Sequence, residues 1–181
     1  AGANPRIVNL SSAGHTHSDV NLDDPNFEKS EYNAWESYGR SKSANIHFTQ
    51  EIVRRYGDRI QSFAVHPGVI MTELGRHLTP ELMNEMTERV KSRATSSSQA
   101  KETGALPFKS VEAGAATQVW ASVTENLSEN NGAYLGDCQV GVEGGNPSES
   151  GYLPYIFNKD TAEALWSLSE KLVKQEFPQL T

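Results

Sequence analysis

The sequence contains one cysteine, Cys138, among its 181 residues. One cysteine cannot form an intramolecular disulfide or a cysteine-based zinc site, which excludes a disulfide-stabilised scaffold and favours a reducing, cytoplasmic compartment. Basic residues are also scarce, with 16 lysines and arginines against 23 acidic side chains, and the net charge is −7. Such a surface repels phosphate backbones, so we expect no nucleic acid among the partners.

Long apolar runs are absent as well. No stretch reaches the roughly 18 apolar residues that a membrane span needs, so we expect no such span in this chain. The chain starts at Ala1 without an initiator methionine, and a strand-like run follows directly after Arg6. This start indicates that an amino-terminal portion is missing, and that portion could carry a targeting or membrane segment.

Short apolar runs, in contrast, alternate with long helical patterns. Three strand-like runs cover residues 7–10, 60–65 and 132–140, and turn residues flank each of them. Two long loops are expected at residues 18–37 and 141–151. This alternation predicts a single α/β domain with a parallel sheet.

Four helices are expected along the chain. The first covers residues 37–56, and its apolar side chains predict burial on more than one side. The second begins at Pro80, directly after the N-cap Thr79. The third begins near Ser110 and the fourth at Asp160.

Apolar residues recur every four positions around the second helix, and they are Leu74, Leu78, Leu82, Met86 and Val90. This stripe could pack in the core, close over a substrate or lie on a membrane surface. We expect residues 73–109 to form a substrate lid that is also partly core, with a mobile stretch at residues 94–103. The third helix is expected to pack through Ala115, Val119, Trp120 and Val123.

Tyr38 and Lys42 lie at the start of the first helix. Their spacing of four places the hydroxyl and the ammonium on one helix face, one turn apart. A nearby cation lowers a tyrosine pKa from its ordinary value of about 10, which suits Tyr38 to act as a general acid/base. Taken alone, the spacing also fits a stacked aromatic ring beside a solvated lysine.

Polar and turn residues follow two of the strands. Ser11 and Ser12 end the first strand, and the sequence His66-Pro67-Gly68 ends the second. Ligands of an open parallel sheet bind beyond the carboxyl ends of its strands. We therefore expect these segments to meet at one edge of the sheet, near Tyr38.

These motifs together resemble a known family. The order RIVNLSS from residue 6, YGRSKSANI from residue 38 and HPGVIMT from residue 66 is similar to the carboxyl-terminal half of a short-chain dehydrogenase/reductase. The long insert between serine and tyrosine, and the sequence LWSLSE from residue 165, resemble the retinol-dehydrogenase-like branch, which also contains the WW-domain oxidoreductases. The resemblance implies part of a Rossmann-like, doubly wound parallel sheet.

The resemblance also implies catalytic roles. Tyr38 would be the acid/base that exchanges a proton with the substrate oxygen. Lys42 would lower the Tyr38 pKa and bind the nicotinamide ribose. Ser12, rather than Ser11, would hold and polarise the substrate carbonyl. The reaction would be hydride transfer between a nicotinamide and a small hydrophobic alcohol, aldehyde or ketone.

The cofactor implied by the resemblance is NADP or NAD, with NADP slightly preferred. Pro67 and Gly68 would shape the turn beside the nicotinamide. The Ile70 backbone and the Thr72 side chain would contact its carboxamide. The resemblance leaves a homodimer open.

The sequence departs from the family in its amino-terminal half. It contains neither G-x-G-x-x-G nor T-G-x-x-x-G-x-G, so the cofactor pyrophosphate has no visible site. We therefore expect residues 1–181 to be the carboxyl-terminal part of one domain, with its first strand as an exposed edge, binding no dinucleotide alone and inactive without the missing half. The alternative is a catalytically silent binding or regulatory module built from half of the fold.

Other motifs favour structural roles. His15, His17 and Asp19 could suggest a metal site, but a solvated loop fits their spacing better, and no metal is expected. His66 is expected to fill a niche at a strand end. Cys138 is expected to be a small buried hydrophobe in a strand. The absence of G-x-S-x-G argues against a serine hydrolase.

Overall fold

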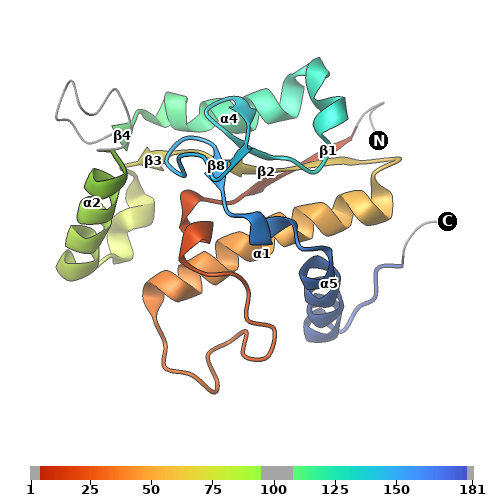
Figure 1. Ribbon diagram of the computed structural model, residues 1–181, viewed down its shortest axis with the longest axis horizontal. Helices are drawn as coiled ribbons and strands as arrows, with labels where there is room; N and C mark the ends of the chain where they lie inside the picture. Colours follow the sequence, from red (N-terminus) through yellow and green to blue (C-terminus); the bar gives the residue numbers. More distant parts are fainter. Residues whose placement is uncertain (1–4, 95–107, 179–181) are drawn as a thin grey trace.

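The computed structural model describes residues 5–94 and 108–178. Helices cover both faces of a central sheet: α1 and α5 lie on one side, and α4 lies on the other (Figure 1). The strands are β1 (Arg6–Leu10), β2 (Gln61–His66), β3 (Val69–Ile70), β4 (Phe108–Lys109), β5 (Tyr134–Gly136), β6 (Gln139–Val140), β7 (Val142–Glu143) and β8 (Gly151–Tyr152). The α-helices are α1 (Ala34–Tyr56), α2 (Pro80–Ala94), α4 (Val111–Val123) and α5 (Lys159–Val173). Four 3-10 helices complete the fold: η1 (Ala13–His17), η2 (Glu73–His77), η3 (Glu125–Asn130) and η4 (Pro154–Phe157).

The central sheet has the strand order β1-β2-β5-β6. Strands β1, β2 and β5 are parallel, as the alternation of strands and helices predicts. β1 pairs only with β2 in the described part of the chain, and its last residue Leu10 is 50% exposed. The expectation that the first strand forms an exposed edge is therefore confirmed.

The third predicted strand is wrong in its length. Residues 132–140 do not form one strand, because the chain turns at Asp137 and Cys138, whose φ angles are 50° and 54°. Two consecutive residues with positive φ make the tight turn that joins antiparallel strands, here β5 and β6. Cys138 is consequently exposed, which contradicts its predicted burial in a strand.

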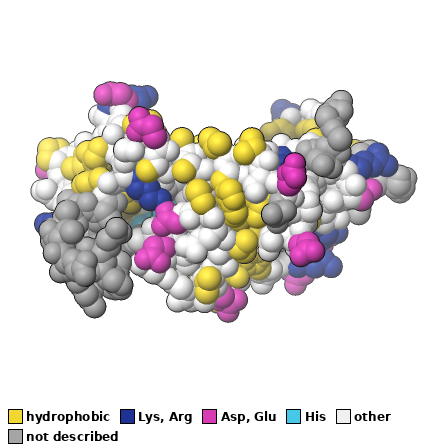
Figure 2. Space-filling model, turned by 90° about the horizontal axis from the view of Figure 1, so that it is seen from above, with side chains coloured by type: hydrophobic (Ala, Val, Ile, Leu, Met, Phe, Trp, Pro, Cys, Tyr) yellow, Lys and Arg dark blue, Asp and Glu magenta, His cyan; other side chains and the backbone are white. Residues whose placement is uncertain are grey.

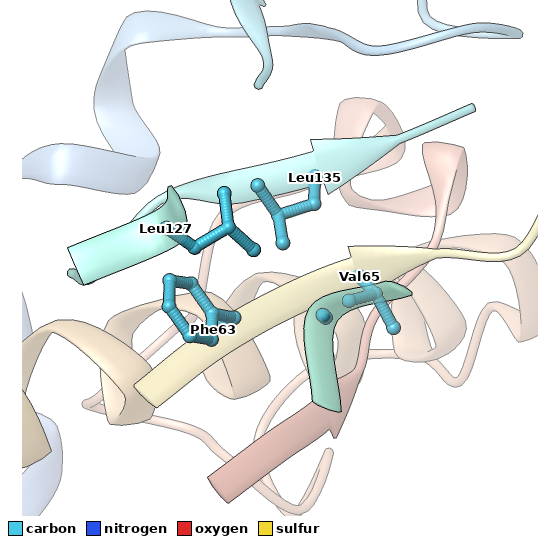
Figure 3. Close-up of a cluster of buried hydrophobic side chains, with 5 residues drawn as sticks. Phe63, Val65, Leu127 and Leu135 are labelled. Atoms are coloured by element: carbon cyan, nitrogen blue, oxygen red, sulfur yellow. The ribbon is translucent and has the colours of Figure 1, made fainter. Parts of the chain in front are cut away.

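The core lies on both faces of β2, whose last five residues are buried. Phe63 and Val65 point to the α4 side, where they pack with Leu127 and Leu135 (Figure 3). Ala64 belongs to the cluster on the opposite face, which also contains Ile46, Tyr134 and Ile156. Successive side chains of a strand point to opposite faces, so burial on both faces makes β2 continuously apolar in its middle.

α1 begins three residues earlier than predicted. The Asn33 side chain accepts a hydrogen bond from the Glu36 amide at 2.9 Å and caps the helix, so residues 34–36 belong to α1 rather than to the preceding loop. Burial on more than one side of the helix is confirmed, with Ile46 and Ile52 among its buried residues. Phe48 stacks on Trp166 of α5, with ring centroids 5.3 Å apart.

The predicted N-cap Thr79 of α2 and the predicted start of α4 near Ser110 are confirmed. The Thr79 hydroxyl accepts from the Leu82 amide at the start of α2, and the Ser110 hydroxyl accepts from the Ala113 amide at the start of α4. α5 begins at Lys159, one residue before its predicted start at Asp160, and its N-cap is Asn158. Leu74 precedes α2 and lies in η2. The predicted mobile stretch at residues 94–103 lies outside the described residues, apart from Ala94.

The predicted packing face of α4 is wrong in part. Trp120 packs against the buried cluster as predicted, but Val119 and Val123 are 57% and 71% exposed, and the buried residues of the helix are Gly114, Thr117 and Ala121. The glycine lets α4 lie close to β3, which pairs with β4 outside the central sheet: a Cβ at residue 114 would lie 2.5 Å from Cγ1 of Ile70. Figure 2, which views this side of the molecule, accordingly shows hydrophobic side chains on the surface.

No helix in residues 5–94 or 108–178 combines the length and the apolar character that a membrane span requires.

Candidate active site

A pocket of about 850 Å³ opens at the carboxyl ends of β1 and β2. It is bounded by η1, the start of α1, the segment after β2, η2, α2 and the first half of α4. All seven residues expected to bind substrate or cofactor line this one pocket: Ser12, Tyr38, Lys42, Pro67, Gly68, Ile70 and Thr72. The structure therefore brings together every site residue that the sequence singled out.

The two serines after β1 have different partners. Ser11 is buried, and its hydroxyl donates to the Lys42 carbonyl at 2.8 Å. Ser12 is the N-cap of η1, and its Oγ accepts from the Gly14 amide at 3.0 Å. Because that bond uses only a lone pair of Ser12, its O–H can still donate to a group in the pocket. The geometry supports Ser12 rather than Ser11 as the serine that would contact a substrate.

Tyr38 lies in the second turn of α1, with its ring against Gly14 of η1. A Cβ at residue 14 would overlap Cε1 of Tyr38 and lie 2.7 Å from its Cδ1, so the ring rests directly on the glycine. Lys42 Nζ lies 5.4 Å from the centroid of the Tyr38 ring. It also donates to the Leu10 carbonyl at 3.4 Å. The helical spacing thus brings the phenol and the ammonium to the end of β1.

Lys42 is the cation beside Tyr38, and its environment is half-buried. Burial lowers the pKa of its ammonium below the ordinary value of 10.5, because leaving water penalises the charged form. A Lys42 charge that is poorly solvated has more to gain from an anion in the pocket than a surface lysine has.

We expect Lys42→Met to stabilise the fold at neutral pH, because methionine keeps an apolar stem and removes the desolvated charge. In the parent, the unfolded chain holds the Lys42 proton more tightly than the folded chain, so stability rises with pH between the lowered folded pKa and 10.5. The free energy of unfolding of Lys42→Met should therefore exceed that of the parent most near neutral pH, and this difference should shrink towards pH 10.5. Urea unfolding over this range measures it, and a difference that grows with pH would contradict the expectation.

The turn after β2 depends on a glycine. Gly68 has a φ of 89°, and a Cβ at this position would lie 2.7 Å from Cδ and Cε of Lys109. Only glycine adopts this conformation without strain. The buried His66 fills the strand end as expected, because its Nδ1 lies 3.2 Å from the Ala13 amide and 3.4 Å from the Gly68 amide. His66 thereby connects the turn to η1.

Ile70 and Thr72 continue the wall of the pocket. Ile70 in β3 packs against Gly114 of α4. Thr72 caps η2, with its Oγ1 accepting from the Leu74 amide at 3.3 Å. As with Ser12, the Thr72 O–H is not consumed by this bond and can donate into the pocket.

Much of the remaining pocket lining is apolar, and it includes residues that the sequence analysis did not single out. Leu74, Leu78, Leu82 and Met86 of the predicted stripe line the pocket, and so do Tyr32, Trp35, Met71 and Met83. Trp35 Nε1 donates to a carboxylate oxygen of Glu85 at 2.5 Å, which joins α1 to α2. The Arg89 guanidinium also lies over the Trp35 ring, 5.1 Å from its centroid. Asn33 is a typical N-cap residue, and a helix predicted to begin after it would have placed the Trp35 side chain on the first turn.

The three residues considered as a metal site do not form one, and the predicted solvated loop is also wrong. His15 is buried in η1, with Nδ1 2.7 Å from the Ser12 carbonyl oxygen. Asp19 accepts instead from Nε2 of His47 at 2.7 Å. The described residues contain no group of three or more histidine, cysteine or acidic side chains that could hold a metal ion.

Comparisons with known proteins agree with this arrangement. No family model matches the chain. Oxidoreductase calI of Penicillium decumbens is 36% identical over 178 residues, which cover 96% of this chain and 49% of that protein. The short-chain dehydrogenase/reductase prx1 of Penicillium roqueforti is 37% identical over 173 residues, or 93% of this chain and 46% of that protein. Human retinol dehydrogenase 14 is 33% identical over 174 residues, or 96% of this chain and 45% of that protein.

A crystal structure of a protein from Mycobacterium paratuberculosis has a TM-score of 0.63 and 25% identity, and the match covers 97% of this chain and 52% of the other. The chain belongs to the short-chain dehydrogenase/reductase family, as its motifs predict. It spans about half the length of the curated relatives it matches, consistent with the carboxyl-terminal half of a Rossmann-like fold.

Proposed function

We propose that the protein carrying this chain is an NAD(P)-dependent oxidoreductase that interconverts a hydrophobic alcohol and its aldehyde or ketone. The observation that carries the proposal is the meeting of Ser12, Tyr38 and Lys42 in one pocket whose remaining lining is largely apolar. A hydroxyl donor, a phenol and a cation suit proton transfer to a carbonyl oxygen. Relatives named as oxidoreductases and dehydrogenases support the same class of reaction.

The proposed chemistry divides the work between these side chains. In reduction, the carbon of the substrate C=O gains a hydride, the C=O π bond breaks, and the oxygen takes the proton of the Tyr38 hydroxyl. Ser12 donates a hydrogen bond to the same oxygen and holds it in place. The Lys42 ammonium stabilises the phenolate left on Tyr38 until solvent returns a proton. Alcohol oxidation reverses each step, with the Tyr38 phenolate accepting the proton.

A nicotinamide dinucleotide, when bound, supplies or accepts the hydride. Pro67, Gly68, Ile70 and Thr72 would hold its nicotinamide end, because the tight Gly68 turn lets the backbone come close and Thr72 offers a free O–H. Lys42 would bind the ribose. A slight preference for NADP over NAD is part of the proposal.

The proposed substrate is apolar because leucine, methionine and tryptophan side chains of α1, η2 and α2 line the same pocket as the reacting groups. Methionines fit irregular hydrophobic ligands well. We also propose that residues 73–109 form the lid over this substrate, with the described part contributing Leu74, Leu82 and Met86. Relatives named retinol dehydrogenase 13 and 14 support a ligand of this kind.

The proposal is tested by assaying the longer protein that carries this chain, with its amino-terminal half, on apolar aldehydes. We expect oxidation of a reduced nicotinamide dinucleotide that depends on the aldehyde. Binding of apolar ligands without any turnover, with either NADPH or NADH, would instead favour the catalytically silent module.

We predict that the 181-residue chain alone binds no dinucleotide. The sequence contains no glycine-rich phosphate loop, so only the nicotinamide end would find partners here. Calorimetric titration of this chain with NADPH should give no heat of binding at micromolar concentrations. Micromolar affinity for the isolated chain would refute the prediction and would place the phosphate site among these residues.

A further inference from the structure

Behind the pocket, η1 takes part in a polar cluster, most of it buried, that the proposed reaction does not use. The cluster consists of His15, Asp19, Ser43, His47 and Tyr155. These residues come from η1, the following loop, α1 and η4, which are far apart in the sequence. His15 is 0% exposed and meets the ring of the buried Tyr134 edge-on, at 5.1 Å between centroids. The cluster therefore joins the carboxyl-terminal segment to the loop that follows Ser12.

Two hydroxyl groups converge on one backbone carbonyl in this cluster. The Tyr155 hydroxyl donates to the His15 carbonyl from η4. Ser43 Oγ lies 3.3 Å from the same carbonyl oxygen and donates to the Ser18 carbonyl at 2.7 Å. Ser43 has a single O–H, and the shorter contact assigns it to the Ser18 carbonyl, so Tyr155 is the principal donor to the His15 carbonyl. The His15 peptide is thus held from η4, while the C-cap residue of η1, Ser18, is held from α1.

The His15 ring makes a second connection. Its Nδ1 lies 2.7 Å from the Ser12 carbonyl oxygen, and its Nε2 lies 3.4 Å from the Leu153 amide nitrogen. A neutral ring protonated on Nδ1 satisfies both contacts, with Nδ1 donating and Nε2 accepting. The imidazole therefore links the peptide of Ser12 to the chain that leads into η4.

Close packing leaves η1 little room to move relative to α1. A Cβ at Gly39 would lie 2.8 Å from the Ser18 amide nitrogen and 2.9 Å from Cβ of His17. One residue earlier on α1, Tyr38 rests on Gly14. A displacement of η1 would consequently move Ser12 relative to α1 and alter the contact between η1 and the Tyr38 ring.

We propose that Tyr155 and His15 are positioning residues, which hold η1 so that Ser12 and Tyr38 face the same substrate oxygen. The proposal rests on the proposed function. Neither side chain lines the pocket, so both act through the backbone of η1 rather than on the substrate. Small displacements of reacting groups are costly, since a misplacement of about 1 Å can reduce turnover about 100-fold.

The Tyr155 hydroxyl is suited to donate a hydrogen bond at every pH in the neutral range. Burial raises the pKa of its hydroxyl above the ordinary value of 10.0. A hydrogen bond with Ser43 lowers the pKa, and the charge of Asp19 raises it, so the pKa stays above the ordinary value. The hydroxyl therefore stays protonated throughout the neutral range and always donates to the His15 carbonyl.

The test is Tyr155→Phe in the longer protein that carries this chain. This variant keeps the ring and removes one hydrogen bond to the His15 carbonyl. We expect kcat to fall about 10-fold to 100-fold, with KM changed less than about twofold. Assays run well below the melting temperature separate this effect from loss of folded protein. An unchanged kcat would overturn the proposal, and so would a change in KM alone.

Tyr152→Phe is the matched control, because it removes a tyrosine hydroxyl three residues away that makes no hydrogen bond to η1 in the described part of the chain. We expect its kcat to stay within about twofold of the parent. An equal fall of kcat in both variants would mean that loosening of the carboxyl-terminal segment, not the bond to His15, affects turnover, and would overturn the proposal.

Amide hydrogen exchange separates this proposal from the proposed function. Tyr155→Phe should speed exchange at the His15 amide, which donates to the Ser12 carbonyl, more than Tyr152→Phe does. This readout stands even if the parent turns over no carbonyl substrate, a result that would refute the proposed function alone. Unchanged exchange in η1 would refute the positioning role. If Tyr155→Phe fails to fold, Ser43→Ala removes the hydrogen bond from α1 to the Ser18 carbonyl at the end of η1, and we expect the same faster exchange and lower kcat.

Discussion

Tyr38→Phe in the longer protein should lower turnover by about 100-fold to 10,000-fold, the usual contribution of a general acid/base. Phenylalanine keeps the ring that rests on Gly14 and removes only the hydroxyl, so the shape of the pocket is preserved. Substrate reduction then lacks its proton donor. Steady-state rates with an apolar aldehyde and NADPH measure the loss.

The control for Tyr38→Phe lies on the same helix. Tyr56 ends α1, and its hydroxyl donates to the Phe177 carbonyl at 3.0 Å, far along the helix from the pocket. Tyr56→Phe should leave turnover within about twofold of the parent. Near-normal activity in Tyr38→Phe would end the assignment of Tyr38 as the acid/base, whatever the control shows.

Gly14→Ala should reduce turnover by about 100-fold, although residue 14 carries no reactive group. The new Cβ would overlap the Tyr38 ring, and either the ring or η1 must move to make room. Each of these shifts changes the separation between the Tyr38 hydroxyl and the Ser12 hydroxyl, because Ser12 caps η1 through the Gly14 amide. The effect should appear mainly in kcat.

Melting curves and substrate affinity provide the controls for Gly14→Ala. Overpacking at this contact costs about 1–3 kcal/mol of stability, so the variant should still fold and melt cooperatively. Full activity in a folded Gly14→Ala protein would show that the contact between η1 and Tyr38 does not set the catalytic geometry.

The candidate site was predictable from sequence because its residues lie next to strand ends. Ser12 follows β1 and Pro67 follows β2, and the carboxyl ends of parallel strands meet at one edge of the sheet. The helical spacing of four then carries Lys42 to the same edge as Tyr38. These are local rules, and they hold without knowledge of the packing.

The errors arose where packing overrides local patterns. Val119 and Val123 have the spacing of a buried helix face, yet α4 packs through Gly114 and Ala121, since small residues permit a closer approach to the strands beneath the helix. The turn at Cys138 depends on backbone angles that no apolar pattern predicts.

The polar cluster at η1 was missed for a related reason. Tyr155 and Ser43 donate to a backbone carbonyl, and a carbonyl is the same at every residue. The sequence therefore gives no sign that residues 43 and 155 meet at residue 15. The apolar pocket wall was only partly predicted, because Trp35 was assigned to the loop before α1.

Transfer of a deuterium label tests the central claim most directly. The longer protein is incubated with an apolar aldehyde and a reduced nicotinamide dinucleotide in which both hydrogens at C4 are deuterium, and the alcohol is analysed by mass spectrometry. The account predicts one deuterium on the carbinol carbon of the product, formed by the parent and nearly abolished in Tyr38→Phe. Product without the label, or equal labelling rates in the two proteins, would contradict it.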